Sequence, residues 1–212
     1  MKKLLSVFIS SITLFMSVFA FEGVIKQQSI DVNSGKSSTI TWHIKGDKIK
    51  MVLESDGKKV ELIPNYTTNS LIMFSDDVQD EEGNLMYMQL NATDIQSSSG
   101  SVAAGDIVAS KYQNKEAKTM DVMNNGNRFK VQFLPSIAFD FSKYSSLLKE
   151  SLEVQAIAVK GLRGFPVQTT LIQNDGKEKI VLRTLSINET SVGEREFIVP
   201  TGYKKFELPN QN

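Results

Sequence analysis

TITWHIKGDKIKMVLESDGKKVEL, residues 39–62, is the stretch that decides the fold. Gly46-Asp47 suits a two-residue hairpin turn with glycine at its first central position, and Asp56-Gly57 favours a type I′ turn. Apolar and polar residues alternate on both sides of each turn, which is the pattern of half-buried strands. The stretch therefore predicts three short antiparallel strands joined by two tight turns.

The two turns also determine which residues lie opposite each other. All of the predicted pairs are apolar: Ile44–Ile49, Trp42–Met51, Ile40–Leu53, Leu53–Val60 and Met51–Leu62. Because side chains alternate across a strand, these residues share one face of the sheet. The opposite face carries His43, Lys45, Lys48, Lys50, Glu54, Lys59 and Glu61. We therefore expect an antiparallel sheet with one apolar face and one face in water.

The N-terminus has the pattern of a secretory signal peptide, residues 1–20. A short basic start, Met1-Lys2-Lys3, precedes an uncharged, mostly apolar run that ends at Val18-Phe19-Ala20. The run is shorter than the roughly 20 residues that span a bilayer, so we expect cleavage after Ala20 and no stable membrane span afterwards. A retained N-terminal anchor is the alternative. We expect the mature protein in the periplasm or the medium.

Residues 21–212 are expected to form a single domain, since no Pro-rich or Gly/Ser-rich linker divides them. Loss of Lys2 and Lys3 leaves 22 basic and 24 acidic residues, and lysines and acids are interleaved. A nucleic-acid binder would show a basic surplus or a basic stripe, so nucleic acid is not expected as a partner. The chain has no cysteine, so an exported fold must rely on a buried core.

The rest of the chain favours strands. We expect strands within 22–32, 71–74, 85–90, 129–133, 165–172, 180–187 and 197–200, which with the three of the central stretch gives about nine to eleven in all. One helix is expected after the cap Ser142, with apolar positions Tyr144, Leu147, Leu148 and Leu152 at helical spacing. A second short helix is expected around 117–123, and residues 91–105 have too few large aliphatic side chains to be buried.

An acidic stretch, residues 76–84, raises the question of a calcium site. Calcium loops of the EF-hand type alternate oxygen ligands at positions 1, 3 and 5 with glycine at position 6 and an acid at position 12. The stretch does not have this spacing. A solvated hairpin tip is the better interpretation, and no metal site is predicted.

Catalytic signatures are missing from the sequence. The single histidine, His43, falls on the polar face of the predicted sheet, and no Gly-x-Ser-x-Gly elbow precedes a helix. Zinc sites need several His or Cys ligands, and the chain has one histidine and no cysteine. Glycoside hydrolysis needs two carboxylates at one cleft, and the spacing of Asp and Glu in this sequence does not indicate such a pair. We therefore expect no enzyme, no catalytic residue and no cofactor, with a hydrolase of unrecognised site as the least favoured reading.

Three stretches resemble a family of exported bacterial proteins with a domain of unknown function: residues 42–51, Gly164-Phe165-Pro166-Val167, and 197–203. That family is in turn similar to the periplasmic lipoprotein carriers LolA and LolB. The resemblance implies a mainly β (α+β) fold, in which a strongly curved antiparallel sheet forms an incomplete barrel with one or two plugging helices. The carriers use an arginine on an early strand to hold the lid, whereas this chain has only lysines there.

The resulting hypothesis is a non-enzymatic protein that binds or carries an acyl chain or lipid on the concave apolar face. The alternative is a structural or envelope-assembly protein in which that face is ordinary core. Flexible thioethers suit a pocket for variable lipids, although methionine also fills ordinary cores. The predicted hydrophobic wall consists of Ile40, Trp42, Ile44, Ile49, Met51, Leu53, Leu62, Met73, Met86 and Met88.

Overall fold

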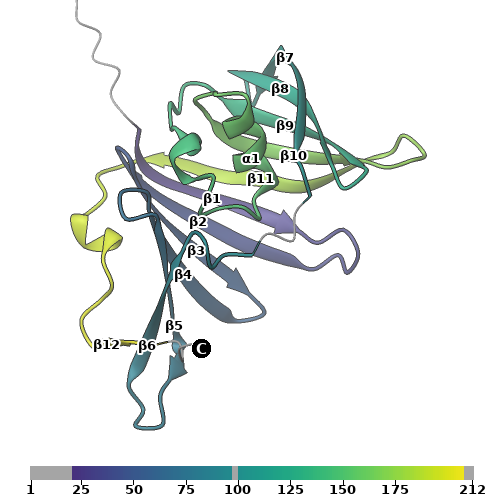
Figure 1. Ribbon diagram of the computed structural model, residues 1–212. Helices are drawn as coiled ribbons and strands as arrows, with labels where there is room; N and C mark the ends of the chain where they lie inside the picture. Colours follow the sequence, from purple (N-terminus) through teal and green to yellow (C-terminus); the bar gives the residue numbers. More distant parts are fainter. Residues whose placement is uncertain (1–20, 97–99, 208–212) are drawn as a thin grey trace, which may run out of the picture.

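Twelve strands form one sheet in the computed structural model, which describes residues 21–96 and 100–207 (Figure 1). They are β1 (Glu22–Ile30), β2 (Ser37–Lys45), β3 (Lys48–Ser55), β4 (Lys58–Asn65), β5 (Ser70–Gln79), β6 (Leu85–Asn91), β7 (Ala103–Tyr112), β8 (Lys115–Asn124), β9 (Asn127–Leu134), β10 (Phe165–Ile172), β11 (Glu178–Glu189) and β12 (Tyr203–Lys205). The predicted signal peptide, residues 1–20, lies outside the described residues.

The strand order is β12-β6-β5-β4-β3-β2-β1-β11-β10-β9-β8-β7. Neighbouring strands are antiparallel, except that the short β12 runs parallel to β6. The mainly β, antiparallel fold predicted from the sequence is confirmed at this level. The sheet is open, with β12 at one edge and β7 at the other.

The register predicted for the β2–β3–β4 meander is confirmed throughout. Trp42 pairs with Met51, and Met51 pairs with Leu62 on the next strand, as the turn positions require. Gly46 has φ +59° at the first turn, and Asp56 and Gly57 have φ +51° and +77° at the second. Both turns therefore use the left-handed region that their residue types favour.

Two short helical elements cover the apolar face of the sheet. A 3-10 helix, η1 (Phe141–Tyr144), precedes helix α1 (Leu152–Val159), which packs against η1, β7 and β10. The sequence predicts one helix beginning after Ser142, but the α-helix begins ten residues later, at Leu152. Asp140 caps η1, and the α-helix begins only after its own cap, Ser151, whose Oγ accepts a hydrogen bond from the Val154 N–H.

Three further sequence expectations need correction. The segment expected to form a short helix, 117–123, lies in strand β8 and pairs with β7 and β9. The expected strand at 197–200 does not form: Phe197 ends a 3-10 helix, η2 (Glu194–Phe197), residues 198–200 have no regular structure, and the final strand comes later as β12. The expectation that residues 91–105 are too poor in aliphatic side chains to be buried is also wrong in part, since Ala92 is buried, Ile95 packs against the core and β7 begins at Ala103. Residues 97–99 lie outside the described residues.

The C-terminal segment, drawn in yellow in Figure 1, connects β11 to the β6 edge and covers part of the face expected to be in water. η2 packs against β3, and Tyr203 of β12 contacts Phe74 of β5 at 5.1 Å between ring centroids. Lys50 and Glu61 are consequently buried. The expectation that this face is in water is therefore wrong over β3 to β5. There the C-terminal segment packs against the sheet, and its Glu194 and Glu196 pair with Lys48 and Lys50.

No helix within residues 21–96 and 100–207 is long and apolar enough to cross a membrane.

Candidate ligand-binding cavity

A cavity of about 530 Å³ lies between the apolar face of the sheet and the segment that leads into α1. We call it the central cavity. Its sheet wall comes mainly from β1 to β5, and its other wall comes from Leu147, Leu148 and Leu152. The apolar residues that complete the lining are Ile30, Ile40, Trp42, Met51, Leu53, Leu62, Leu71, Met73, Ile95, Phe129, Val181 and Leu182.

Trp42 holds a fixed position in the sheet wall. Its indole Nε1 donates a 2.8 Å hydrogen bond to Oε1 of Gln27, a buried residue on the neighbouring strand β1. Its ring meets Phe141 and Phe165 edge-on, with centroids 5.9 and 5.4 Å apart. The aromatic packing and the hydrogen bond together satisfy both the apolar body and the polar N–H of the buried indole.

Six polar residues also line the central cavity: Ser29, Asn124, Lys149, Glu150, Ser151 and Glu153. The Lys149 ammonium donates to the carbonyls of Ala92 and Ile95 at 2.8 and 3.0 Å. Oδ1 of Asn124 is buried and has no hydrogen-bond partner among the described residues. The cavity therefore combines a largely apolar lining with a few polar groups that a ligand head group could contact.

Six of the ten residues predicted as the hydrophobic wall line the central cavity: Ile40, Trp42, Met51, Leu53, Leu62 and Met73. Ile44 and Ile49 share the same face of the sheet but are buried in the core, and neither lines the central cavity; Ile49 instead lines a cavity at the β2–β3 turn. Met86 and Met88 line a separate cavity at the β6 edge. The sequence did not indicate Phe129 or Leu182, because strand pairing brings them in from distant β9 and β11.

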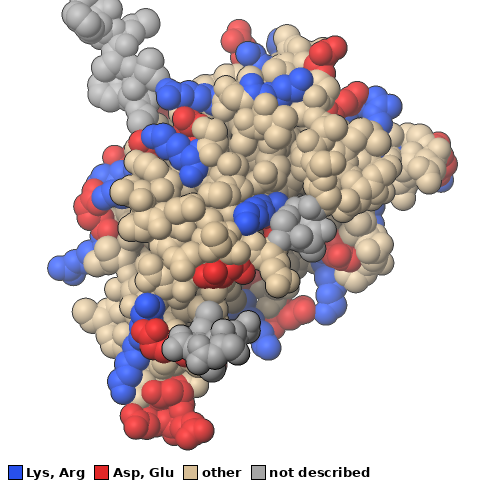
Figure 2. Space-filling view, in the orientation of Figure 1, with Lys and Arg blue, Asp and Glu red and all other residues tan. Residues whose placement is uncertain are grey.

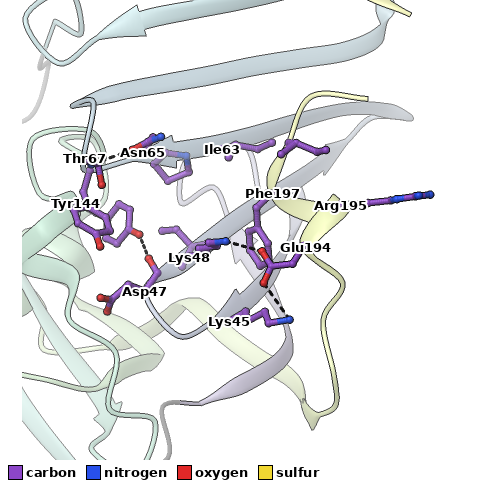
Figure 3. A pocket seen from close by; sticks show the side chains of 14 residues that line it. Lys45, Asp47, Lys48, Ile63, Asn65, Thr67, Tyr144, Glu194, Arg195 and Phe197 are labelled. Atoms are coloured by element: carbon purple, nitrogen blue, oxygen red, sulfur yellow. Dashed lines mark hydrogen bonds and ion pairs between the residues drawn. The ribbon is translucent and has the colours of Figure 1, made fainter. Parts of the chain in front are cut away.

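A second cavity, of about 450 Å³, lies where the β2–β3 turn meets η1 and η2 (Figure 3). Lys45 and Lys48 both approach the Glu194 carboxylate, at 3.3 and 2.6 Å. The Tyr144 hydroxyl donates to the carbonyl of Asp47, and burial raises the pKa of that hydroxyl. The polar groups seen here are thus engaged with each other, which favours a role in attaching η1 and η2 to the hairpin.

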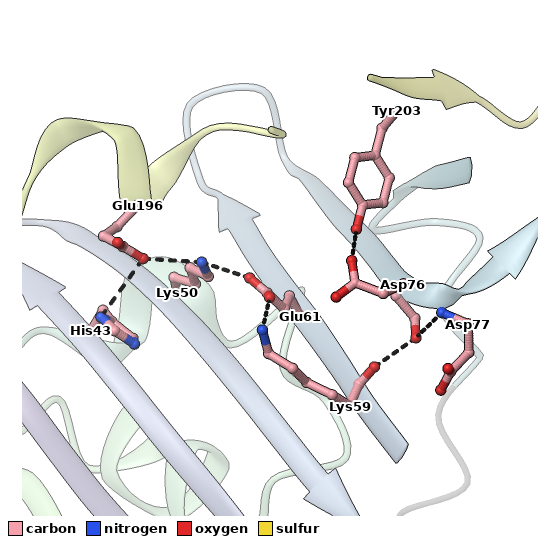
Figure 4. Close-up of polar contacts among 9 residues, drawn as sticks. His43, Lys50, Lys59, Glu61, Asp76, Asp77, Glu196 and Tyr203 are labelled. Carbon is pink, nitrogen blue, oxygen red and sulfur yellow. Dashed lines mark hydrogen bonds and ion pairs between the residues drawn. The ribbon is translucent and has the colours of Figure 1, made fainter. Parts of the chain in front are cut away.

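On the opposite face, a chain of charged groups links the C-terminal segment to the sheet (Figure 4). The Lys50 ammonium lies 2.6 Å from the Glu61 carboxylate and 3.1 Å from that of Glu196 on η2. Burial acts to raise the pKa of Glu61, but hydrogen bonds from Lys50 and Lys59 outweigh it and hold that pKa below its ordinary value. The buried carboxylate is therefore charged and paired.

His43, predicted on this polar face, lies beside the same cluster. Its Nδ1 is 3.9 Å from the Glu196 carboxylate. Burial lowers the pKa of His43 and prevails over the attraction of Glu196, so the neutral ring is favoured. No group of three or more His, Asp or Glu residues with metal-binding geometry occurs among the described residues.

Comparison of this chain with known proteins does not assign it to a family. No protein-family model and no curated protein matches the chain. Solved structures that match include PNGF-II in the P21 space group, at 14% identity and a TM-score of 0.49, covering 89% of this chain and 32% of that one. PNGF-II in the C2 space group matches at 14% identity and a TM-score of 0.49, with coverages of 88% and 31%. The chain spans about a third of the length of both.

Proposed function

We propose that this protein binds or carries a hydrophobic ligand, an acyl chain or a lipid, in the central cavity. The observation that supports it is the cavity itself, because its 530 Å³ falls within the roughly 300–1,000 Å³ typical of small-molecule sites. Its lining follows the usual composition of such sites, with many apolar side chains and a few polar ones. A role as a non-enzymatic binding protein needs no reactive group there.

The energy available to an acyl chain is sufficient for useful affinity. Each buried CH₂ contributes about 0.8 kcal/mol, so a dozen contribute roughly 10 kcal/mol. Ordering the chain and losing its free motion take back part of this gain. What remains is compatible with a dissociation constant near 1 μM, which corresponds to about −8 kcal/mol.

Two parts of the proposal rest on the sequence. The first is the likeness to the LolA and LolB carriers, in which a strongly curved sheet forms an incomplete barrel and helices plug it; η1 and α1 would then be the plug. The second is export, with cleavage after Ala20. N-terminal sequencing of the protein produced with its own leader tests the second part, since the expected first residue is Phe21 and recovery of Met1 in the membrane fraction would contradict export.

Binding is tested through Trp42, the only tryptophan in the chain. Protein stripped of lipid should change its Trp42 emission saturably when palmitate or lysophosphatidylcholine is added at micromolar concentrations. Organic extracts of natively purified protein should contain a lipid in near-stoichiometric amount by mass spectrometry. The emission change reports the central cavity directly, because the indole forms part of its wall.

A matched pair of variants separates the cavity from the surface. Leu53 lines the cavity, and the adjacent Glu54 points to the other side of β3 and is exposed. Leu53→Gln should weaken palmitate binding at least several-fold, because it places an amide against the chain, whereas Glu54→Gln should leave binding unchanged. If the parent protein binds none of these lipids and yields none on extraction, the cavity belongs to the core of a structural protein and the carrier proposal is wrong.

A further inference from the structure

Three of the predicted wall methionines line a cavity separate from the central cavity, and Met73 contributes to both. Met73, Met86 and Met88 line a separate apolar cavity of about 280 Å³ at the β5–β6 edge, which we call the methionine cavity. Met73 is the register partner of Met88 across β5 and β6. Met86 is two residues before Met88 on the same strand, so alternation puts its side chain on the same face.

These positions allow the three thioethers to converge. Directly paired residues in antiparallel strands have Cα atoms about 4.5–5.5 Å apart, and residues i and i+2 of one strand are about 7 Å apart. Methionine is unbranched with three rotatable bonds, so each sulfur can adjust its position within such a triangle. All three side chains are partly exposed rather than sealed in the core, so a solute can reach them.

The charges next to the methionine cavity favour a cation. Residues 70–84, which form β5 and the following turn, contain five acids and no lysine or arginine: Asp76, Asp77, Asp80, Glu81 and Glu82. Val78 lines the cavity from within this acidic stretch. Figure 2 shows the resulting red cluster at the lower end of the molecule, at the tip of the β5–β6 hairpin. Lys204 on β12, the register partner of Met86, lies 3.4 Å from the Glu82 carboxylate and offsets part of this charge. The acids still outnumber it, and the remaining negative field attracts cations.

The carboxylates supply the field rather than the ligands. Oδ1 of Asp80 already accepts hydrogen bonds from the backbone N–H groups of Glu82 and Asn84, at 3.0 and 2.8 Å. Asp76 accepts a hydrogen bond from the Tyr203 hydroxyl. Hard cations such as Ca²⁺ need six to eight oxygens, whereas soft thioethers select Cu(I).

From the three thioethers that line one cavity next to the acidic hairpin tip, we infer that the methionine cavity is a binding site for a soft monovalent metal ion, Cu(I). Met73, Met86 and Met88 supply the sulfur ligands, and the acidic hairpin tip raises the local cation concentration. The site is independent of the proposed lipid function, although Met73 borders both cavities.

Silver(I) is the first probe, since it has the same charge and preference for sulfur and does not change oxidation state under the conditions used. Native mass spectrometry of the purified protein should show one Ag⁺ bound at micromolar concentration. Anaerobic competition with bicinchoninate should give a matching single Cu(I) site. Met73→Leu, Met86→Leu and Met88→Leu should each weaken binding at least ten-fold, because leucine fills a similar volume without a sulfur.

Met123→Leu is the control. Met123 is an exposed thioether on β8, remote from the methionine cavity in the strand order, and its loss should leave the affinity unchanged. Thermal melting of each variant establishes that it is folded. If the three cavity variants bind Ag⁺ and Cu(I) as tightly as Met123→Leu does, the inference is overturned.

A second measurement needs no variant. Protein labelled with ¹³C at the methionine methyl groups should show saturable shifts of the Met73, Met86 and Met88 resonances on addition of one equivalent of Ag⁺. The buried Met120 and exposed Met123 should not shift. Shifts spread evenly over all methionines, or confined to exposed ones, would mean that the ion does not occupy the methionine cavity.

Discussion

The Nε1–H of Trp42 is hydrogen-bonded to Oε1 of Gln27, and the same Gln27 amide donates through Nε2 to the carbonyl of Pro166 at 2.7 Å. Nε2 also lies 3.2 Å from the hydroxyl of Thr184. One buried side chain thus links strands β1, β2, β10 and β11 across the middle of the sheet. Because Trp42 also lines the central cavity, this network determines where the cavity wall lies.

Replacing Gln27 should be costly for that reason. Gln27→Leu removes the partners of the Trp42 N–H, the Pro166 carbonyl and the Thr184 hydroxyl in a site with almost no access to water. Each unsatisfied buried group costs about 1–3 kcal/mol, so we expect the free energy of unfolding to fall by at least 2 kcal/mol in urea titrations. Gln28→Ala, whose side-chain bond to Arg183 is exposed, should cost less than about 1 kcal/mol. Equal losses for the two variants would contradict the network.

The Gly46 turn gives a second prediction. Gly46 has φ +59°, and a Cβ placed there would meet no atom within 4 Å, so any cost of substitution comes from the backbone and not from crowding. Gly46→Val should lower the free energy of unfolding by about 1–2 kcal/mol. Lys48→Thr, which loses an exposed ion pair with Glu194, should change it by less than about 1 kcal/mol. The two melting temperatures measure the difference.

The sequence predicted the central meander because its information there is local. Gly46 and Asp56-Gly57 specify two-residue turns, and a two-residue turn determines the register of both strands that it joins. All five predicted pairs from Ile40 to Leu62 are observed for this reason. The six wall residues that line the central cavity follow from the same register.

The sequence predicts a helix where strand β8 lies, because buried and exposed residues do not alternate strictly along this strand. Ala117, Met120 and Val122 are all buried, and the spacing of three between the first two imitates a helical turn. The pairing with β7 contains an irregularity between Ala104 and Ile107, which disturbs the period-two pattern on that partner strand too.

The cover over the polar face could not be predicted from local patterns. Glu194 and Glu196 meet Lys48 and Lys50 from 146 residues away in the sequence. Nothing in the alternation of residues 39–62 distinguishes a lysine in water from one that an acidic tail segment will bury. The separation of Met86 and Met88 from the central cavity likewise depends on sheet geometry rather than on strand parity.

The buried ion pair offers a third prediction. Lys50 and Glu61 are about 10% exposed at the side chain, so Lys50→Met would leave Glu61 with Lys59 alone and remove one contact of Glu196. Breaking a buried pair by removing one partner costs about 3–5 kcal/mol. Lys130→Met is the control, since its pair with Glu178 has the same 2.6 Å separation but is exposed. Its loss should cost at most about 1 kcal/mol in urea titrations. Comparable losses would show that the Lys50 pair is as hydrated as the surface one.

The dependence of stability on pH gives the last prediction, through His43. Burial lowers its pKa in the folded state from the ordinary value of 6.5, so the unfolded chain binds more protons as the pH falls below that value. The contribution of neutral His43 is therefore complete above pH 6.5 and is lost as the pH falls towards the lower pKa of the folded state. Since the sequence has one histidine, the interval from pH 7.5 to 5.5 isolates this group from the carboxylates. Urea titrations should show the parent losing more stability over that interval than His43→Gln. A parent that becomes more stable towards pH 5.5 would mean that the attraction of Glu196, 3.9 Å away, outweighs burial and that the ring is charged in the fold.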